Sequence, residues 1–486
     1  MKATSIFGGV QVFNIIIAII RSKVIAVLLG PAGMGIAGLF NSSIGLVGNL
    51  TNFGLGRSAV KNIAEANESS DSIRIAKVAK IFRKLVWITG LLGAVLCFVL
   101  ASYLSQLSFG NKEYTYAFQW LSITLLFNQL TSGRFVLLQG MRKLKLLAKA
   151  NMLGSVVGLF ATLPLYYYYN VKGIVPAIIL TAFFTFCIAW YFSRKIKAEK
   201  VSVSSKETKE VSKEMLTMGF MLSLKGFIVI GASYIIRIYI SNVGGIDDVG
   251  LYTAGFAIIG TYVGLVFSAM GTDFYPRLSG VAHDNEKAAL LINQQAEIGL
   301  LILAPILTAF FIFINWAVIL LYSQKFIAVN GMIQWAALGM YFRVGSWAIA
   351  FILLAKGASK LFFWNELVAN IYKLAFNILG YYFWGLEGLG ISFLLSFIFY
   401  LFQIYYLAHY KYQFSFNTVF YRIFIFQFII GICGFLITKF LPSPLSYFLG
   451  LPVIFASCWY SYKELDKRMG LKEVILNLKD KYVRKR

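Results

Sequence analysis

The chain has 486 residues, of which 59% are hydrophobic and only 13% are charged, and its formal net charge is +25. A soluble domain carries about 25% charged residues, so this composition excludes a soluble enzyme or a soluble binding module. The excess of Lys and Arg would indicate a nucleic-acid partner in a soluble protein, but in a membrane protein the positive-inside rule also predicts it. We therefore expect an integral membrane protein.

A cluster of glycines stands near the start of the chain, in "LLGPAGMGIAGLF" (28–40), where Gly33, Gly35 and Gly38 have the spacing G-x-G-x-x-G. This spacing binds dinucleotide phosphates where a strand enters a helix and an acidic residue follows about 20 positions later. Here both flanks are apolar and long enough for helices, and "GRSAVKN" stands near the expected acidic position. The glycines therefore predict a tight turn and close helix packing, not a cofactor site.

A membrane-spanning helix needs about 20 mostly apolar residues, and fourteen segments meet this requirement. They cover residues 7–29, 33–56, 85–107, 117–138, 146–168, 172–192, 216–241, 249–273, 297–321, 328–354, 361–384, 388–410, 420–440 and 445–462. The sequence therefore predicts an all-α integral membrane protein with about 14 transmembrane helices. Three prolines crowd the last two segments, which makes these the least regular.

The connections between these segments alternate in length and charge. One set is long and basic, as in "MRKLKLLAK" and "SRKIKAEKVSVSSKETKEVSKE", whereas the other set is short, as in "GPAG" and "GLEG". Most of the 45 Lys and Arg lie in the first set or at the two termini. Because basic loops stay in the cytoplasm, we expect both termini on the cytoplasmic side.

The chain also repeats itself, since one constant offset superposes Gly140 on Gly357 and Lys143 on Lys360, each before an apolar helix that ends in aromatic residues. Two parallel copies of a six-helix lobe around a central cavity are typical of transporters, although apolar helices can also resemble one another by composition alone. The expected parts are an N-terminal lobe (1–192), a cytoplasmic linker (193–215), a C-terminal lobe (216–412), an extra helix pair 13–14 (413–463) and a basic cytoplasmic tail (464–486).

Basic side chains occur inside the predicted helices, where each costs roughly 2.5–3.5 kcal/mol at the membrane centre. They are Arg21, Lys23, Arg134, Lys225, Arg237, Arg343 and Lys373. The one central acidic residue, Glu366, cannot pair with all of them, so we expect water, an anionic ligand or both beside them. Lys23 and Arg134 are the two for which snorkelling to the interface is the stronger explanation.

Polar side chains accompany these cations, and Glu366, Asn370, Lys373 and Asn377 follow the spacing of one helix face. A water-filled cavity is the interpretation we favour for the basic residues, and hydrogen bonding between packed helices is the alternative. The candidate substrate-binding residues are Arg21, Arg237, Arg343, Lys373, Lys225, Asn14, Asn49, Asn52, Asn370 and Asn377. Glu366 is the candidate coupling residue.

The remaining residues that often carry chemistry form no recognisable set. The four cysteines and two histidines lie apart, in apolar segments and polar connections respectively: Cys97, Cys187, Cys433, Cys458, His283 and His409. We therefore expect no metal and no cofactor. A membrane glycosyltransferase, polymerase or ligase would need catalytic groups in a large outer loop, but the predicted outer loops are mostly short, so we do not expect an enzyme.

The first hairpin, "LLGPAGMGIAGLFNSSIGLVGNLTNFGLGRSAVKNIAE", resembles that of the Wzx-type oligosaccharide-lipid flippases, which belong to the multidrug/oligosaccharidyl-lipid/polysaccharide exporter superfamily. The resemblance implies a flippase in the bacterial inner membrane that moves an undecaprenyl-pyrophosphate-linked oligosaccharide, such as an O-antigen repeat unit, from the cytoplasmic to the periplasmic leaflet by alternating access. It also implies a polysaccharide polymerase and chain-length proteins as partners. In lipid II flippases of this superfamily the last two helices form a groove for the lipid tail, which is an expectation for helices 13–14.

The chemistry of such a substrate agrees with the residues. A pyrophosphate needs Arg or Lys where water is excluded, the sugars need a polar cavity, and the polyprenyl chain needs only the bilayer. The alternative is a MATE-like ion-coupled drug antiporter, which would need cavity carboxylates, and Glu366 is the one candidate. An inside-negative potential favours outward movement of an anion by about 2.3 kcal/mol per charge per 100 mV. We therefore expect coupling to the potential, with proton coupling through Glu366 as the alternative.

Overall fold

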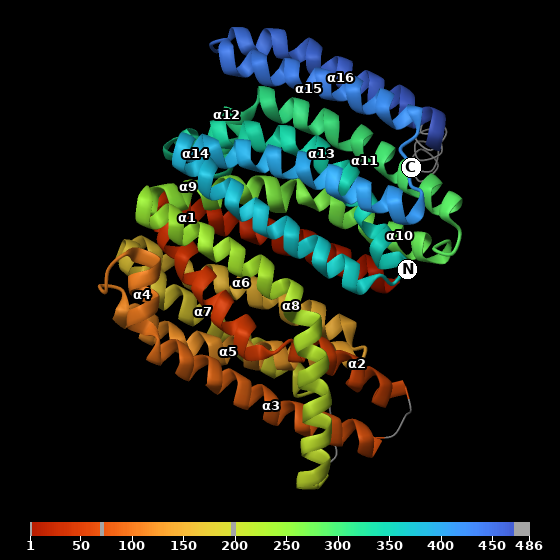
Figure 1. Cartoon of the computed structure of the whole chain (residues 1–486). Coiled ribbons are helices and arrows are strands. Elements are labelled where there is room, and N and C mark those ends of the chain that lie inside the picture. Colours follow the sequence, from red (N-terminus) through yellow and green to blue (C-terminus); the bar gives the residue numbers. More distant parts are fainter. Residues whose placement is uncertain (1, 69–71, 196–200, 471–486) are drawn as a thin grey trace, which may run out of the picture. The chain divides into compact units, whose positions relative to one another are not determined.

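The structure is a computed structural model that describes residues 2–68, 72–195 and 201–470. These residues form helices joined by turns and loops, and no β-strand occurs among them (Figure 1). The predicted all-α fold is thereby confirmed. Within the described ranges, ten helical segments are long and apolar enough to cross a membrane.

The helices group into two compact units, which we call the first unit (1–254 with 321–326) and the second unit (255–320 with 327–486). The first contains α1 (Lys2–Asn52), α2 (Leu55–Glu68), α3 (Ser72–Val99), α4 (Ala101–Phe109), α5 (Thr115–Gly140), α6 (Leu144–Tyr169), η1 (Asn170–Gly173), α7 (Ile174–Ser193), α8 (Ser205–Val243) and most of α9 (Ile246–Ala257). The second contains η2 (Ile258–Tyr262), α10 (Gly264–Gly280), α11 (Asn285–Ile312), most of α12 (Ile314–Leu321), α13 (Asn330–Ala355), α14 (Ser359–Tyr412), α15 (Thr418–Phe440) and α16 (Leu445–Met469). The short η3 (Gln324–Val329) contributes residues to both.

Three of the candidate membrane segments are much longer than one pass requires. Residues 9–52, 144–193 and 359–412 contain 44, 50 and 54 residues, or about 65–80 Å of helix where a hydrocarbon core measures about 30 Å. Each therefore has room for two passes, which is compatible with fourteen helices. The number fourteen, and the division into six-helix lobes expected from the repeat, stay predictions.

The glycine cluster of the first hairpin has a structural role, as its flanks predict. Helix α1 bends at Gly30, whose φ of 68° suits a residue without a Cβ, and Pro31 then begins the continuing helix. A Cβ on Gly35 would lie 2.1 Å from the carbonyl oxygen of Ile246, and one on Gly250 would lie 1.9 Å from that of Pro31. The backbones of α1 and α9 therefore touch, and only glycine fits at both contacts.

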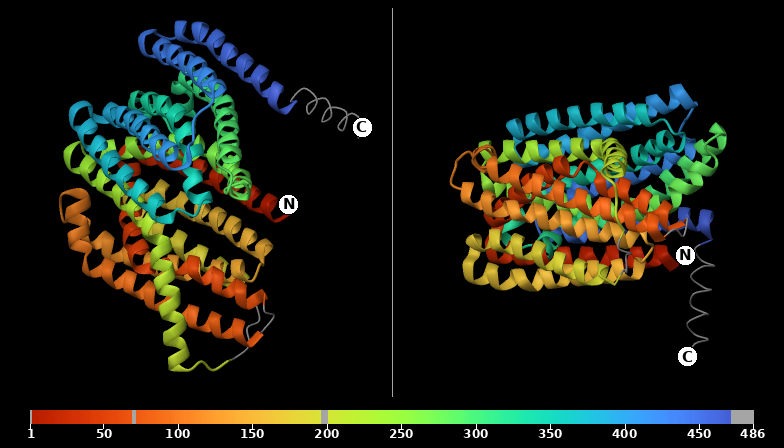
Figure 2. Two further views of the ribbon diagram at one scale, coloured as in Figure 1. Left: turned by 45° about the vertical axis from the view of Figure 1, so that its right-hand side comes forward. Right: turned by 90° about the horizontal axis from the view of Figure 1, so that it is seen from below.

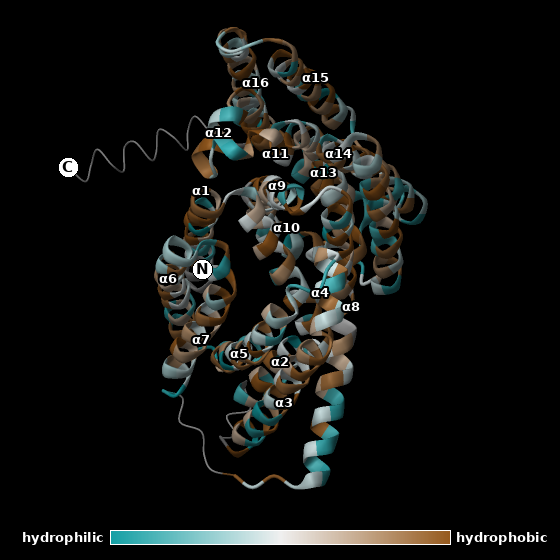
Figure 3. Ribbon diagram, turned by 90° about the vertical axis from the view of Figure 1, so that its left-hand side faces the viewer, coloured by the Kyte–Doolittle hydropathy of each residue, from teal (hydrophilic) through white to brown (hydrophobic). Residues whose placement is uncertain are grey.

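Helices α3, α8 and α11 begin earlier than their apolar patterns predict. The extra turns are polar and have their own start signals: Ser204 accepts a hydrogen bond from the Glu207 backbone N–H (3.1 Å), and Asp284 accepts one from that of Lys287 (3.1 Å). Figure 3 shows the polar start and the more apolar remainder of α8 in one continuous helix. The predicted linker is thus helical from Ser205 onward, and its residues 196–200 lie outside the described ranges.

In the second unit, α15 and α16 form an antiparallel pair (Figures 1 and 2). Glu297 on α11 accepts hydrogen bonds from Asn417 Nδ2 (2.9 Å) and Arg468 Nε (3.0 Å), and Arg468 Nη1 also donates to Glu464 Oε2 (2.8 Å). Both carboxylates are buried, at 4% and 5% exposure. This polar cluster joins α15 and α16 to α11. These two helices contain the last two predicted membrane segments, and their expected role as a groove for a lipid tail stays a prediction.

Candidate functional site

Two of the predicted arginines line one cavity in the first unit, with a volume of about 530 Å³, between α1, α8 and α9. We call it the first-unit cavity. Its polar lining residues are Arg21, Ser22, Asn41, Ser42, Ser233, Arg237 and Thr253. The lining residues include two cations, hydroxyls and an amide but no carboxylate, so the site favours an anion that also accepts hydrogen bonds.

Helix α8 presents Arg237 to this cavity because a buried tyrosine one turn earlier fixes the helix against α1. The Tyr234 hydroxyl lies 3.1 Å from Ser43 Oγ, which donates to it. Arg237 Nη1 donates to the Ser233 carbonyl (2.9 Å) and also to the Ser233 hydroxyl, while the guanidinium carbon lies 5.3 Å from the centre of the Tyr252 ring. These contacts hold the guanidinium in place, and none of them neutralises its charge.

Arg21 is held less tightly by its surroundings. Its Nε is buried and has no hydrogen-bond partner in the described part of the chain. A Cβ on Gly158 would lie 3.3 Å from Arg21 Nη2, so the guanidinium reaches across to α6. Arg21 also lines a second, smaller cavity of about 200 Å³ between α1, α5, α6 and α7. An arginine keeps its proton in proteins, so this charge needs an anion or water.

The basic side chains of the second unit have different surroundings from those of the first unit. Arg343 lines a cavity of about 460 Å³ with Phe267, Tyr275, Trp347 and Phe351. Its guanidinium carbon lies 5.0 Å from the centre of the Phe267 ring. The ring faces stabilise the cation through their quadrupoles, and the other polar groups that line the cavity are the hydroxyls of Ser268, Thr272 and Tyr275.

Lys373 belongs to the same aromatic arrangement. The Arg343 guanidinium lies 5.4 Å from the centre of the Phe397 ring, and Lys373 Nζ lies 4.8 Å from it. Lys373 Nζ also lies 4.4 Å from the centre of the Tyr400 ring, and the Tyr400 hydroxyl donates to Glu366 Oε1 (2.6 Å). Two cations and one carboxylate are thus connected through two aromatic side chains.

Two of the predicted amides serve helix packing and capping. Asn14 Nδ2 donates to Asn151 Oδ1 (2.7 Å), and Asn14 Oδ1 accepts from Ser155 (3.0 Å), which joins α1 to α6. Asn52 Oδ1 accepts from the Leu55 backbone N–H (3.1 Å) at the start of α2. These contacts are those of the alternative interpretation, hydrogen bonding between elements.

The other predicted residues occupy varied positions. Asn49 faces α8 at Gly226, where a Cβ would lie 3.7 Å from its Nδ2, and Asn370 donates to the Glu366 carbonyl (2.8 Å). Asn377 Oδ1 is buried and without a hydrogen-bond partner among the described residues. The side chain of Lys225 lies outside what the structure describes. For all of these residues the binding role stays a prediction.

Sequence reasoning missed several lining residues. Asn41 and the selected Asn49 have the i, i+8 spacing of one helix face, so helical spacing could have included Asn41. Ser22 directly follows Arg21 and had no such signal. Phe397 and Tyr400 carried no such signal, because they are two among 44 phenylalanines and 28 tyrosines. Only the packing of the folded chain identifies them as the contacts of Arg343 and Lys373.

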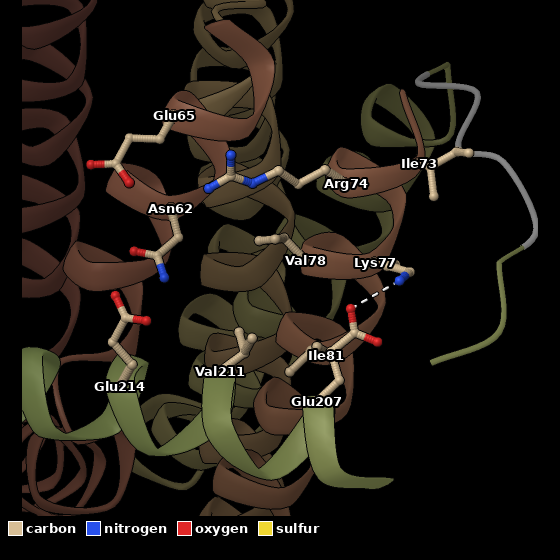
Figure 4. A pocket seen from close by; sticks show the side chains of 10 residues that line it. All are labelled: Asn62, Glu65, Ile73, Arg74, Lys77, Val78, Ile81, Glu207, Val211 and Glu214. Atoms are coloured by element: carbon tan, nitrogen blue, oxygen red, sulfur yellow. Dashed lines mark hydrogen bonds and ion pairs between the residues drawn. The ribbon is translucent and has the colours of Figure 1, made fainter. Parts of the chain in front are cut away.

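A further pocket of about 400 Å³ lies between α2, α3 and the polar start of α8 (Figure 4). It mixes charges of both signs, and Lys77 Nζ forms an ion pair with Glu207 (2.9 Å). Lys80 Nζ also donates to the Val201 carbonyl (2.7 Å). Three carboxylates beside two cations suit a contact between helices better than a site for a strongly anionic ligand.

Comparison with known proteins gives a family and a fold. The sequence profile described as "Polysaccharide biosynthesis protein" matches residues 1–282, a segment that contains the first-unit cavity. The chain is 21% identical to the lipid III flippase of Escherichia coli (strain K12), over 71% of this chain and 82% of that protein. It is 22% identical to a putative O-antigen transporter of Shigella flexneri, over 75% of this chain and 87% of that protein.

Solved structures show the same architecture. The lipid II flippase MurJ in an inward closed conformation matches with a TM-score of 0.70 and 12% identity, over 95% of this chain and 99% of that one. A multidrug resistance MATE family transporter of the MOP superfamily, in an inward-facing conformation, matches with a TM-score of 0.67 and 16% identity, over 83% and 94% of the two chains. The chain thus has the fold of these two solved transporters. Because the family profile covers more than half of the sequence, the chain belongs to the polysaccharide biosynthesis protein family.

Proposed function

We propose that the protein is a flippase that moves an undecaprenyl-pyrophosphate-linked oligosaccharide from the cytoplasmic to the periplasmic leaflet of the bacterial inner membrane by alternating access. The observation that carries this proposal is the first-unit cavity, in which Arg21 and Arg237 stand among hydroxyl and amide groups without a carboxylate. The curated relatives are named as a flippase of a lipid-linked intermediate and an O-antigen transporter, not as enzymes.

Each part of such a substrate has a matching chemistry in the chain. The pyrophosphate is multiply anionic, and two guanidinium groups can each offer it paired N–H donors. The sugars can exchange water hydrogen bonds for those of Asn41, Ser42 and neighbouring polar groups. The second unit has its own pair of cations, Arg343 and Lys373. The lipid chain needs only contact with the bilayer.

The MATE-like drug antiporter is the second candidate, and the observation in its favour is the fold shared with a multidrug transporter. A cationic drug would need a carboxylate to receive it. The first-unit cavity offers two arginines instead, and Glu366 in the second unit is already hydrogen-bonded by Tyr400. The charges therefore favour an anionic substrate over a cationic one.

The proposal includes an orientation, with both termini in the cytoplasm. Cysteines placed at Gly245 or Glu387 should react with an impermeant maleimide in intact cells, whereas cysteines placed at Ser204 or Asp284 should react only after permeabilisation. The reverse pattern would invert the predicted topology and the direction of transport. If the orientation is right, polymerase and chain-length proteins that act on the exported glycan are the partners we expect.

The decisive experiment is depletion of the protein in its own host, followed by mass spectrometry of the polyprenyl-linked lipids. We expect one polyprenyl-pyrophosphate oligosaccharide to accumulate, and to be inaccessible to a glycan-modifying reagent added outside spheroplasts. Restored expression of the wild-type protein should remove it. Unchanged lipid intermediates together with new sensitivity to cationic drugs would reject the flippase and favour the antiporter.

A further inference from the structure

The smaller cavity of the first unit contains a second arrangement of polar groups, which the proposed function does not use. We call this cavity of about 200 Å³ the threonine pocket. Its polar lining includes Arg21, Thr124, Thr162, Tyr166, Thr181 and Thr185. None of the residues that line it in the described chain carries a carboxylate. The pocket thus combines one cation with several hydroxyls, and its size suits a few waters or one small hydrated ion.

The four threonine hydroxyls differ in whether their protons are available. Thr162 donates to the Leu159 carbonyl (2.8 Å), and Thr185 donates to the Thr181 carbonyl (2.7 Å). The hydroxyls of Thr124 and Thr181 are buried and have no hydrogen-bond partner in the part of the chain that the structure describes. Thr124 is only 2% exposed. Because a hydroxyl has a single proton to donate, only these last two can donate to a ligand.

Arg21 supplies the charge. Gly158 makes room for it on α6, since a Cβ there would lie 3.3 Å from Arg21 Nη2 and 2.9 Å from Thr181 Cγ2. The guanidinium and the Thr181 side chain therefore meet at the same small residue. A buried cation and buried hydroxyl donors without partners are both unfavourable, and one anion would satisfy them together.

We infer that the threonine pocket is a binding site for a small monovalent inorganic anion of the halide class, held by Arg21, Thr124 and Thr181. The pocket has no second cation, so one negative charge is the complement of its lining. A pyrophosphate-linked glycan needs far more space than about 200 Å³ and belongs in the larger first-unit cavity.

Arg21 lines both cavities, and this sharing gives the small anion a place in the transport cycle. This step rests on the proposed function. When the pyrophosphate engages Arg21 from the first-unit cavity, the small anion loses its cation and leaves. When the substrate has gone, the anion returns and neutralises Arg21 inside the membrane, where an unpaired charge is costly. Substrate and small anion therefore compete.

Bromide is a suitable probe, titrated calorimetrically into the purified full-length protein in a gluconate buffer. We expect one saturable bromide site per chain. The double variant Thr124→Val/Thr181→Val should bind bromide at least tenfold more weakly, and Thr181→Val alone should already show a loss. Thr185→Val is the matched control: it removes a hydroxyl whose proton is already engaged, so the bromide affinity should stay within about twofold of the wild type. Thermal unfolding without halide checks that each variant is folded.

Absence of saturable bromide binding by the wild type would overturn the site, and so would equal affinities of the double variant and Thr185→Val. Inorganic pyrophosphate should weaken bromide binding to the wild type, and an unchanged bromide affinity would overturn the exchange. These results are independent of the depletion experiment. Bromide binding without accumulation of a lipid-linked glycan would reject the flippase and keep the anion site.

Discussion

Each unit contains a pair of predicted substrate-binding cations whose surroundings the structure describes, and these surroundings differ. In the first unit, Arg21 and Arg237 stand at a cavity lined by several hydroxyls and one amide. In the second, Arg343 and Lys373 lie against the faces of aromatic rings. An aromatic face stabilises a cation by about 0.5–2 kcal/mol without occupying its hydrogen-bond donors. Both cations of the second pair thus lie against aromatic rings. In the first pair Arg237 has one such contact, with Tyr252, whereas Arg21 depends more on an anion.

The largest effect should come from Arg21. Arg21→Ala removes a buried cation from both first-unit cavities, and losing one partner of a buried charge pair costs about 2–5 kcal/mol. We expect the rate of substrate flipping in reconstituted vesicles to fall by at least 30-fold. Arg21→Lys should recover part of it, because the charge returns without the paired donors.

Arg134→Ala is the control for this variant, since Arg134 lies on α5 and was expected to snorkel rather than to bind. Its flipping rate should stay within about twofold of the wild type when both proteins are inserted at equal levels. A wild-type rate for Arg21→Ala would reject the distinction between the two units.

A smaller effect is expected from Phe397, which both second-unit cations face. Phe397→Leu removes the ring from Arg343 and Lys373 together, so at about 0.5–2 kcal/mol we expect flipping to slow by about two- to 30-fold. Phe397→Tyr keeps the ring and should stay near the wild-type rate. Phe399→Leu changes an exposed ring on the same helix and is the matched control. Equal rates for the two leucine variants would show that the aromatic contacts do not position the cations.

Glu366 is the carboxylate that Tyr400 connects to the second pair of cations, so its replacement tests what drives transport. If the potential drives transport, Glu366→Gln should leave the rate within about threefold when valinomycin imposes a potential at constant pH. The Gln side chain can still accept the hydrogen bond from Tyr400. Flipping that ignores the potential and follows a pH step at zero potential, and that Glu366→Gln abolishes, would instead make Glu366 the coupling residue.

The sequence predicts some features of the candidate site and not others for a physical reason. Basic residues within apolar segments are visible in the sequence, and helical periodicity groups residues on one face of one helix, such as Glu366 and Lys373. The apolar flanks of Gly35 excluded a nucleotide site and predicted its structural role. Periodicity contains no information about which aromatic ring from another helix faces a cation, so Phe397 and Tyr400 were missed. The same limit applies to Asn14 and Asn52, whose spacing could not distinguish a cavity from a helix contact.

The polar first turns of α3, α8 and α11 were also not predicted from the sequence. The requirement of about 20 apolar residues locates the membrane-spanning part of a helix. It does not locate polar extensions, such as the first turns of α8 after its N-cap Ser204. The ion pairs of these extensions join residues far apart in sequence, as Lys77 and Glu207 do. These ion pairs cannot be predicted from the sequence, because only the folded chain brings the two side chains together.

Two carboxylates outside the predicted membrane spans, Glu207 and Glu464, differ in how far they are exposed. The side chain of Glu207 in the first unit is 37% exposed in its pair with Lys77. The side chain of Glu464 in the second unit is only 7% exposed and accepts hydrogen bonds from Lys467 and Arg468. Hydrogen bonds from the Arg468 guanidinium and then from Lys467 lower the pKa of Glu464 from 4.5 to about 2. A lowered pKa means that the folded state favours the charged carboxylate.

The sign of the pH dependence follows from this shift. The contribution of Glu464 to the free energy of unfolding is complete above its ordinary pKa of 4.5 and is lost as the pH falls from there towards about 2. We expect Glu464→Gln to lower the free energy of unfolding in detergent by about 1.5–3 kcal/mol at pH 7, as for hydrogen bonds to a charged group. This difference from the wild type should shrink near pH 3, because the same carboxyl group is protonated there in the unfolded chain. Glu207→Gln, in the exposed pair, should change the free energy by less than about 1 kcal/mol. A Glu464→Gln difference that is the same at pH 7 and pH 3 would show that the side chain acts through packing and not through its charge, and the contrast between the two carboxylates would then be one of burial alone.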